Sequence, residues 1–264
     1  MCEFRSDLSV RERVFFDEDF YKKLSSDIIN KVDIHRDKYS EYCRLYCEGS
    51  EDIKEEYYKN AMDNMFVPRV STVLTDGRKC GKLSSEEIFD GVIYYIKQST
   101  GVPIYSEDYY SGKLGRRSFY FHEDDRLIVV QYSSAKTKFM SFVFDGIYEM
   151  CYQDNRISSF VYYNDRNIRW YEMYTYTNDH LTGCDRFIDF NIGEPVSYIT
   201  DKVSQDGIFY GDKNPVTVQS FKYIYEKDVI VETECTTTNL EEVTIIKRKV
   251  KSNEYKKLRK QRFL

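Results

Sequence analysis

The sequence has no apolar run that approaches the ~18 residues needed to cross a membrane as a helix. The stretch from Met1 to Asp7 also lacks the basic start, followed by an apolar segment, that is typical of a secretory signal. The seven cysteines are odd in number and irregularly spaced, which is typical of free thiols in a reducing compartment and not of a disulfide framework. We therefore expect a cytoplasmic protein with no membrane contact.

Signatures of nucleophilic catalysis are missing as well. The sequence has no Gly-x-Ser-x-Gly elbow and no Cys-Gly nucleophile signature. Histidine occurs only at His35, His122 and His180. The last two fall in predicted hairpin turns, where exposure to solvent is a simpler interpretation than a catalytic base. We name no catalytic residue and no cofactor, and this pattern disfavours an enzyme.

Two segments come close to motifs for phosphate or metal chemistry, and each departs from its motif. In the stretch 75–84, three residues separate Gly77 from Gly81, whereas a phosphate-binding loop needs four, and the residue after Lys82 is neither Ser nor Thr. Carboxylates at 228, 232 and 234 are spaced as in some nucleases, but the Lys expected two residues after Glu234 is absent. We interpret the first segment as a turn and the second as an exposed strand face.

Cys43 and Cys47 stand four residues apart on a predicted helix, with His35 two turns earlier. These three residues could offer ligands to zinc. Closed zinc sites usually draw paired ligands from two separate loops, and the sequence has no second Cys or His pair. Buried thiols that behave as small apolar residues are the favoured interpretation, so we predict no metal site.

Aromatic residues, in contrast, are abundant: they make up 16% of the chain and include 25 Tyr. Between residues 117 and 189, aromatic pairs run repeatedly into short clusters of Asp, Asn, Arg and His and then into an aliphatic residue. Asp and Asn tolerate the left-handed backbone of tight turns, and the flanking aromatic and β-branched residues suit strands. Tyr152, Tyr163 and Tyr176 lie 11 and 13 residues apart, as expected of successive antiparallel strands. This pattern predicts a β-meander.

Alternation extends the predicted sheet to the C-terminal region. Leu127 to Val130 is apolar on both faces and should be central in the sheet. Trp170, Tyr174 and Tyr176 should share one face of a later strand. The strands predicted after residue 103 cover 117–121, 127–132, 140–144, 170–176, 186–192, 207–210, 216–225, 229–236 and 243–250.

The N-terminal part predicts helices. Apolar residues recur at three and four positions in segments that begin near Asp17, Tyr39, Glu51 and Ser84, the last with a capping box, while 70–75 looks extended. We therefore predict an α+β protein. Its expected domains are a mainly helical domain (1–101), a Tyr-rich antiparallel meander (102–250) and a basic tail (251–264).

Charge is distributed unevenly along the chain. The whole chain carries a net charge of -5, whereas residues 247–264 carry +8, which leaves -13 on the remainder. An acidic body repels nucleic acid at long range and favours a basic partner. The tail could neutralise phosphates, but a solvated extension is favoured because basic chain ends are common and usually unstructured. Its candidate nucleic-acid contacts are Lys256, Lys257, Arg259 and Lys260.

The repeated unit of aromatic residues, acidic turn and aliphatic residue resembles the YD-type repeats of secreted polymorphic toxins and of some of their cognate immunity proteins. Segments 119–127 and 174–181 carry the resemblance. The sequence departs from that pattern because no Gly precedes the Arg-Leu pair and no long repeat array is present. The resemblance therefore implies the cytosolic antagonist and not the toxin.

The leading hypothesis is a binding protein that neutralises a basic toxin or effector domain by occlusion. Aromatic anchors would supply buried area, and carboxylates would steer the partner. One alternative is an enzyme acting on nucleotides or nucleic acid through the turn 77–82 and His122, and another is an RNA-binding accessory protein that uses the tail. The predicted partner-binding residues are Trp170, Tyr174, Tyr176, Asp154, Asp165 and Asp179.

Overall fold

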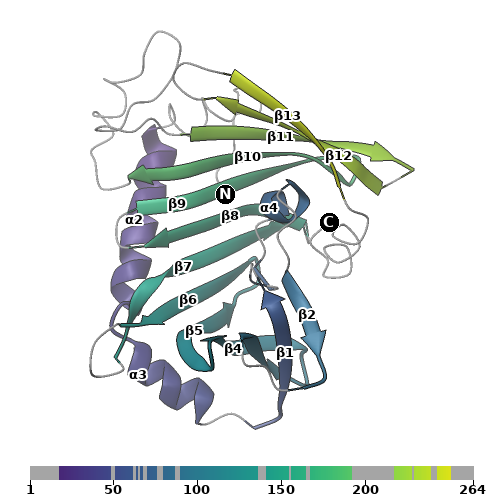
Figure 1. Ribbon diagram of the computed structural model, residues 1–264. Helices are drawn as coiled ribbons and strands as arrows, with labels where there is room; N and C mark the ends of the chain where they lie inside the picture. Colours follow the sequence, from purple (N-terminus) through teal and green to yellow (C-terminus); the bar gives the residue numbers. More distant parts are fainter. Residues whose placement is uncertain are drawn as a thin grey trace.

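The fold is predominantly β. The computed structural model describes residues 18–48, 51–61, 64, 66–67, 70–75, 80–86, 90–135, 141–154, 156–164, 167–191, 217–227, 229–238 and 243–250. Within these ranges, 13 strands form one antiparallel sheet in the order β13-β12-β11-β10-β9-β8-β7-β6-β5-β4-β3-β1-β2 (Figure 1). From β3 to β13 each strand pairs with the next strand in the chain, which confirms the predicted meander.

The strands are mostly nine to twelve residues long in the centre of the sheet and shorter at its two ends. Their bounds are β1 Ile53–Ala61, β2 Cys80–Ser84, β3 Gly91–Lys97, β4 Val102–Tyr110, β5 Lys113–His122, β6 Arg126–Ser134, β7 Phe142–Gln153, β8 Arg156–Asn164, β9 Asn167–Thr177, β10 His180–Asn191, β11 Thr217–Glu226, β12 Val229–Thr238 and β13 Val243–Lys249. The predicted domain boundary at residue 101 falls in the β3–β4 hairpin, so the sheet continues across it.

Helices are fewer than the sequence predicted. Helix α2 (Glu18–His35) and the segment formed by α3 (Tyr39–Tyr42) and the π-helix η1 (Cys43–Cys47) agree with the first two expected helices. The helices expected from Glu51 and from Ser84 are wrong, because these regions contain strands β1 and β3. The extended segment expected at 70–75 is also wrong, because it forms helix α4 (Val70–Thr75).

These wrong predictions arise because local sequence patterns did not decide between helix and strand in these segments. Apolar residues four positions apart, such as Ile53 and Tyr57, lie on one face of a helix, but they also lie on one face of a strand because four is a multiple of two. Pairing of β1 with β2 on one side and β3 on the other decides between the two. In the segment that forms α4, several β-branched residues favoured a strand. Its buried residues Val70, Val73 and Leu74 are instead spaced as on one face of a helix.

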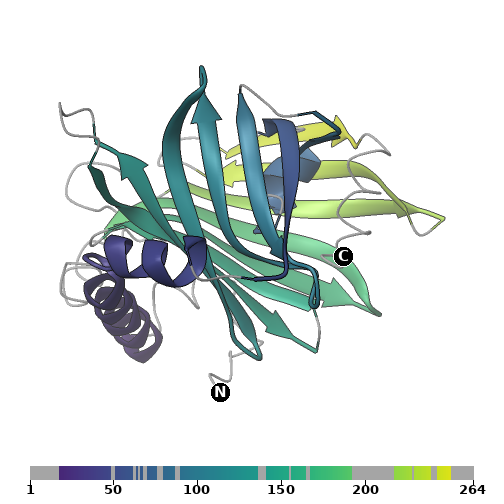
Figure 2. The same cartoon turned by 90° about the horizontal axis from the view of Figure 1, so that it is seen from below.

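The sheet has a buried core on each face. On β6, Ile128 and Val130 pack with α2 and α3, whereas Leu127 and Val129 point to the opposite face and pack in the cluster that contains α4. Figure 2 shows the sheet strongly curved, with α2 and α3 outside and α4 on the concave side. Burial on both faces confirms that β6 is a central strand.

The concave core joins the two ends of the sheet. Its buried cluster includes Tyr58 on β1, Leu74 on α4, and Phe221 and Tyr223 on β11. Curvature therefore lets a helix of six residues complete a core that a flat sheet would leave open. Within the described residues, no helix is both long enough and apolar enough to cross a membrane.

Two of the predicted acidic turns, at 153–156 and 177–180, are confirmed by their backbone. Asp154 has a φ of 51°, Asn178 of 48° and Asp179 of 69°, all in the left-handed region that Asp and Asn tolerate better than most residues. These residues close the β7–β8 and β9–β10 hairpins. The predicted strand at 207–210, the loop residues 76–79, Asp165 and the tail from residue 251 lie outside the described residues.

His35, at the end of α2, should make stability depend on pH. Its ring packs against Tyr42 and Phe121, and burial, followed by the positive charge of Lys31, lowers its pKa. Because the unfolded chain then binds a proton more readily than the folded chain does, stability is lost as pH falls through about 6.5.

We expect the free energy of unfolding of the wild type to fall relative to that of His35→Gln between about pH 7 and pH 5, and the difference between them to be constant at higher pH. Urea denaturation of both proteins across this range is the measurement. Parallel pH profiles for the two proteins would contradict the prediction.

Candidate functional site

Four of the side chains on β9 point to the concave face, and neighbouring strands extend their row. Alternation places Trp170, Glu172, Tyr174 and Tyr176 on this face, which confirms that the three predicted aromatic residues share it. The register sets Arg186 of β10 opposite Glu172. Gln219 of β11 is opposite Arg186 in turn. A carboxylate, a guanidinium and an amide thus follow one another across three strands.

Glu172 is completely buried, at 0% exposure, and is held by several donors. Trp170 Nε1 donates to Glu172 Oε1 at 2.6 Å, and the hydroxyl of Tyr174 donates to Oε2 at 2.5 Å. The hydroxyl of Ser71, in the first turn of α4, also donates to Glu172. Hydrogen bonds to an ionised carboxylate are stronger than neutral ones, so these donors offset part of the cost of burying the charge.

Arg186 is only 4% exposed and balances that charge. Its Nε lies 3.4 Å from Glu172 Oε1, and Nη1 donates to Gln219 Oε1 at 2.9 Å. The guanidinium carbon lies 4.4 Å from the centre of the Trp170 ring and 4.5 Å from that of Phe221. Arg186 is therefore enclosed between two aromatic rings, a favourable environment for a desolvated cation.

Ser71 connects this ion pair to α4. Arg186 Nε donates to Ser71 Oγ at 3.0 Å, and Ser71 in turn donates to Glu172. The three residues form a closed buried network that fixes the helix to the middle of the concave face. The sequence contained one signal for it: a Glu at a position of β9 whose neighbours on the same face are aromatic, where an unpaired charge would be costly.

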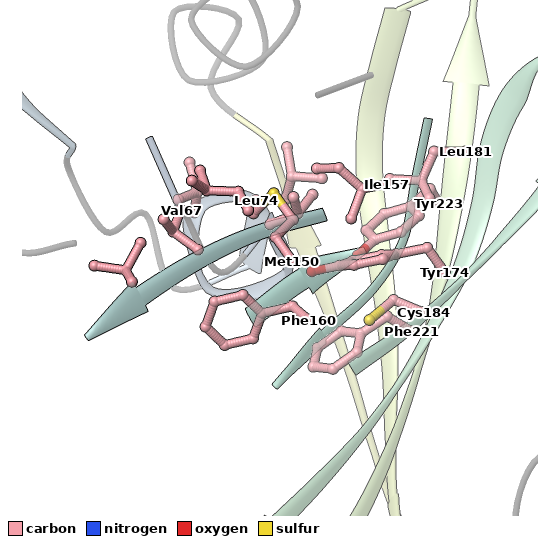
Figure 3. Packing of buried hydrophobic residues seen from close by; sticks show 14 of the residues in the cluster. Val67, Leu74, Met150, Ile157, Phe160, Tyr174, Leu181, Cys184, Phe221 and Tyr223 are labelled. Carbon is pink, nitrogen blue, oxygen red and sulfur yellow. The ribbon is translucent and has the colours of Figure 1, made fainter. Parts of the chain in front are cut away.

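The groups next to this network are not poised for chemistry. Burial is the main cause that raises the pKa of Tyr174, Cys184 and Tyr223 well above their ordinary values. Figure 3 shows these side chains packed together with Phe221. Neutral, buried hydroxyl and thiol groups are poor bases and poor nucleophiles. The concave cluster is therefore suited to holding the fold and not to turning over a substrate.

A second group of polar residues lies at one end of the sheet. The β3–β4, β5–β6, β7–β8 and β9–β10 turns all fall at this end because alternate hairpins of a meander share an edge. We call the exposed acidic residues there the turn edge. They are Glu51, Asp52, Glu123, Asp124, Asp125, Asp154 and Asp179.

Basic residues of the adjacent strands neutralise only part of the turn edge. Arg126 pairs with Glu123 at 3.1 Å and Asp125 at 3.2 Å. Arg156 pairs with Asp179 at 2.6 Å. Among the described residues, Asp124 and Asp154 have no salt-bridge partner. The end of the sheet therefore keeps a negative surface on a rigid framework.

The predicted partner-binding residues divide between these two places. Trp170 and Tyr174 belong to the buried network, and Tyr174 is only 9% exposed. Asp154 and Asp179 belong to the turn edge. Tyr176 lies next to it, since Arg156 lies over the Tyr176 ring at 5.7 Å while pairing with Asp179. Sequence reasoning missed Glu172, Arg186 and Ser71.

The three candidate zinc ligands have other contacts. Arg117 Nη1 donates to Cys43 Sγ at 3.2 Å, and burial raises the pKa of Cys47 to about 12. His35 Nδ1 is 2.6 Å from the Tyr42 hydroxyl. A neutral thiol at Cys47 is not the form that binds zinc. No group of three or more potential metal ligands occurs among the described residues.

The buried ion pair should be strongly coupled. Arg186→Met leaves the Glu172 carboxylate buried without its counter-charge, and we expect it to lower the free energy of unfolding by about 3–5 kcal/mol. Glu172→Gln together with Arg186→Met should cost less than the sum of the two single changes. Urea denaturation of the three variants measures this coupling.

The surface pair formed by Arg156 and Asp179 is the matched control. Because both side chains are exposed, Arg156→Met should cost about 0–1 kcal/mol. Additive effects of the changes at Glu172 and Arg186 would mean that the two charges do not depend on each other.

Comparison of the chain with models of protein families, with curated proteins and with solved structures gives no match. Neither the fold nor the site therefore inherits an activity from a relative. The resemblance to YD-type immunity proteins stays a prediction, and function must be argued from the geometry of the described residues.

Proposed function

We propose that the protein is a binding protein that covers a basic surface of a protein partner with its turn edge. The observation that carries the proposal is the row of exposed carboxylates on successive hairpin turns at one end of the sheet. Turns of alternate hairpins are two strands apart, about 10 Å, so they present charges over a broad surface. Such a surface attracts a basic protein at long range and speeds its encounter.

Rigidity of the framework supports the proposal. Asp154 and Asp179 sit in left-handed turns at the ends of long, paired strands, and little conformational freedom remains to be lost on binding. The buried network around Glu172 adds a fixed support beneath β9 and β10. In this role Trp170 and Tyr174 hold the surface in shape, whereas Tyr176, Asp154 and Asp179 lie next to the partner.

The specific form that we propose is neutralisation of a basic toxin or effector domain, as an immunity protein. Its support is the sequence resemblance together with the acidic turn edge, since occlusion needs complementarity of shape and charge and no catalytic group. The proposal is therefore made in two steps: binding of a basic protein, and inhibition of that protein by binding.

The first step predicts that one basic protein co-purifies in stoichiometric amount with the tagged chain from its native host at low salt. Neutralising the turn edge by Asp124→Asn, Asp154→Asn and Asp179→Asn should weaken binding about tenfold or more, mainly through a slower association rate. Asn is chosen because it keeps the left-handed turns. Surface plasmon resonance with the recovered partner gives both rate constants.

The control carries the same change in charge on the convex side of the sheet, away from the turn edge. Asp33, Asp37 and Glu41 are exposed residues in or between the helices there. The variant Asp33→Asn, Asp37→Asn, Glu41→Gln should bind like the wild type. Equal loss of binding in both triple variants would indicate a general charge effect, and recovery of nucleic acid instead of a protein would overturn the proposal.

The second step is tested with the recovered partner in cells. Expression of the partner alone should stop growth, and co-expression of the wild-type chain should restore it, whereas the turn-edge variant should restore it less. A partner that is harmless when expressed alone would leave binding in place and reject neutralisation.

A further inference from the structure

The last strand of the sheet, β13 (Val243–Lys249), is a regular edge strand among the described residues. It pairs with β12 along its whole length with no shift in register, and no other described strand pairs with it. The strand at the other edge, β2, has only five residues, and its Gly81 adopts a φ of 89°. Short or irregular edge strands resist pairing with other chains, whereas long, regular ones favour it.

The backbone groups that β13 leaves open can be identified. Val250, just after the strand, donates its N–H to the carbonyl of Val231 at 2.8 Å, so Val250 faces β12. Backbone groups of an antiparallel strand face its two sides alternately. The even-numbered residues of β13 therefore bond to β12, and Ile245, Lys247 and Lys249 direct their N–H and C=O groups outward.

The edge carries two exposed isoleucines, and two of its three basic residues are opposite carboxylates of β12. Ile245 is 59% exposed and Ile246 is 58% exposed, and as neighbours in a strand they lie on opposite faces. Lys247 pairs with Glu234 of β12 at 2.9 Å. Lys249 is opposite Glu232. Carboxylates of β12 thus offset the lysines that would otherwise repel an approaching basic strand.

We propose that β13 pairs with β13 of a second copy of this chain, antiparallel about a two-fold axis at Ile246. In this register Ile245 is opposite Lys247 and Lys249 is opposite Val243, so the outward backbone groups of each strand meet those of the other. No cation is directly opposite another cation. Ile246 meets Ile246 of the second copy as a non-hydrogen-bonded pair, in which side chains approach most closely.

This register is self-complementary, as an isologous interface must be. A shift of one residue would set inward-facing groups against outward-facing ones and lose the hydrogen bonds. Contact along seven residues is smaller than a standard interface of about 1,600 Å², so the dimer should be weak, with a Kd on the order of tens of µM. Two sheets then form one continuous sheet, with a turn edge in each copy.

The first experiment measures mass by sedimentation velocity over a range of concentrations. We expect mostly dimer at about 200 µM and mostly monomer at about 2 µM. Ile245→Pro removes one outward N–H without touching the bonds to β12, and proline is tolerated on the open side of an edge strand. This variant should be monomeric throughout with an unchanged Tm. Ile245→Thr, which keeps the N–H, should still form dimers.

The second experiment tests the axis itself. Ile246→Lys and Ile246→Glu each place like charges opposite one another at the two-fold axis and should each abolish the dimer. An equimolar mixture of the two variants should restore dimers, because opposite charges then meet. A monomeric wild type at 200 µM, a dimer that survives Ile245→Pro, or a mixture that stays monomeric would overturn the proposal.

Discussion

The buried pair of Glu172 and Arg186 is the interaction on which the concave side of this protein depends. A fully buried carboxylate is tolerable only with a counter-charge and hydrogen bonds. Here they come from residues of β9 and of the adjacent strand β10, and from one residue distant in the sequence. Ser71 of α4 contacts both charges. The pair therefore ties a helix of six residues, too short to be stable alone, to the strands on which it rests.

The position of α4, which this ion pair fixes, completes the concave core. With α4 in place, the curved sheet closes its concave core between β1 and β11, while α2 and α3 cover the central strands from the other side. Strands β6 to β9 can then be apolar on both faces. Such a scaffold holds its hairpin turns in fixed positions, which is what a binding surface made of turns requires.

The two surfaces considered for binding differ in chemistry and in location. The turn edge is acidic and is made of side chains, so it suits selection of a basic partner by charge. The β13 edge offers backbone groups and two exposed isoleucines, and its lysines are balanced by β12. Pairing through backbone groups depends on a partner strand of matching register and not on the charge of the partner. The two surfaces can therefore be occupied at the same time.

Local sequence patterns were enough to predict the meander. Asp and Asn at turn positions and alternation between them are local signals, and they located the strands from β5 onward and the shared face of Trp170, Tyr174 and Tyr176. Spacings of four residues, as in β1, satisfy a helix and a strand equally, so pairing with distant strands decided there. Tertiary structure also decided the site: it buried Tyr174 and brought Ser71 to Glu172 and Arg186 across about a hundred residues. Contacts between residues so far apart leave no periodic trace in the chain, which is why local patterns predicted the strands and not the network that joins them.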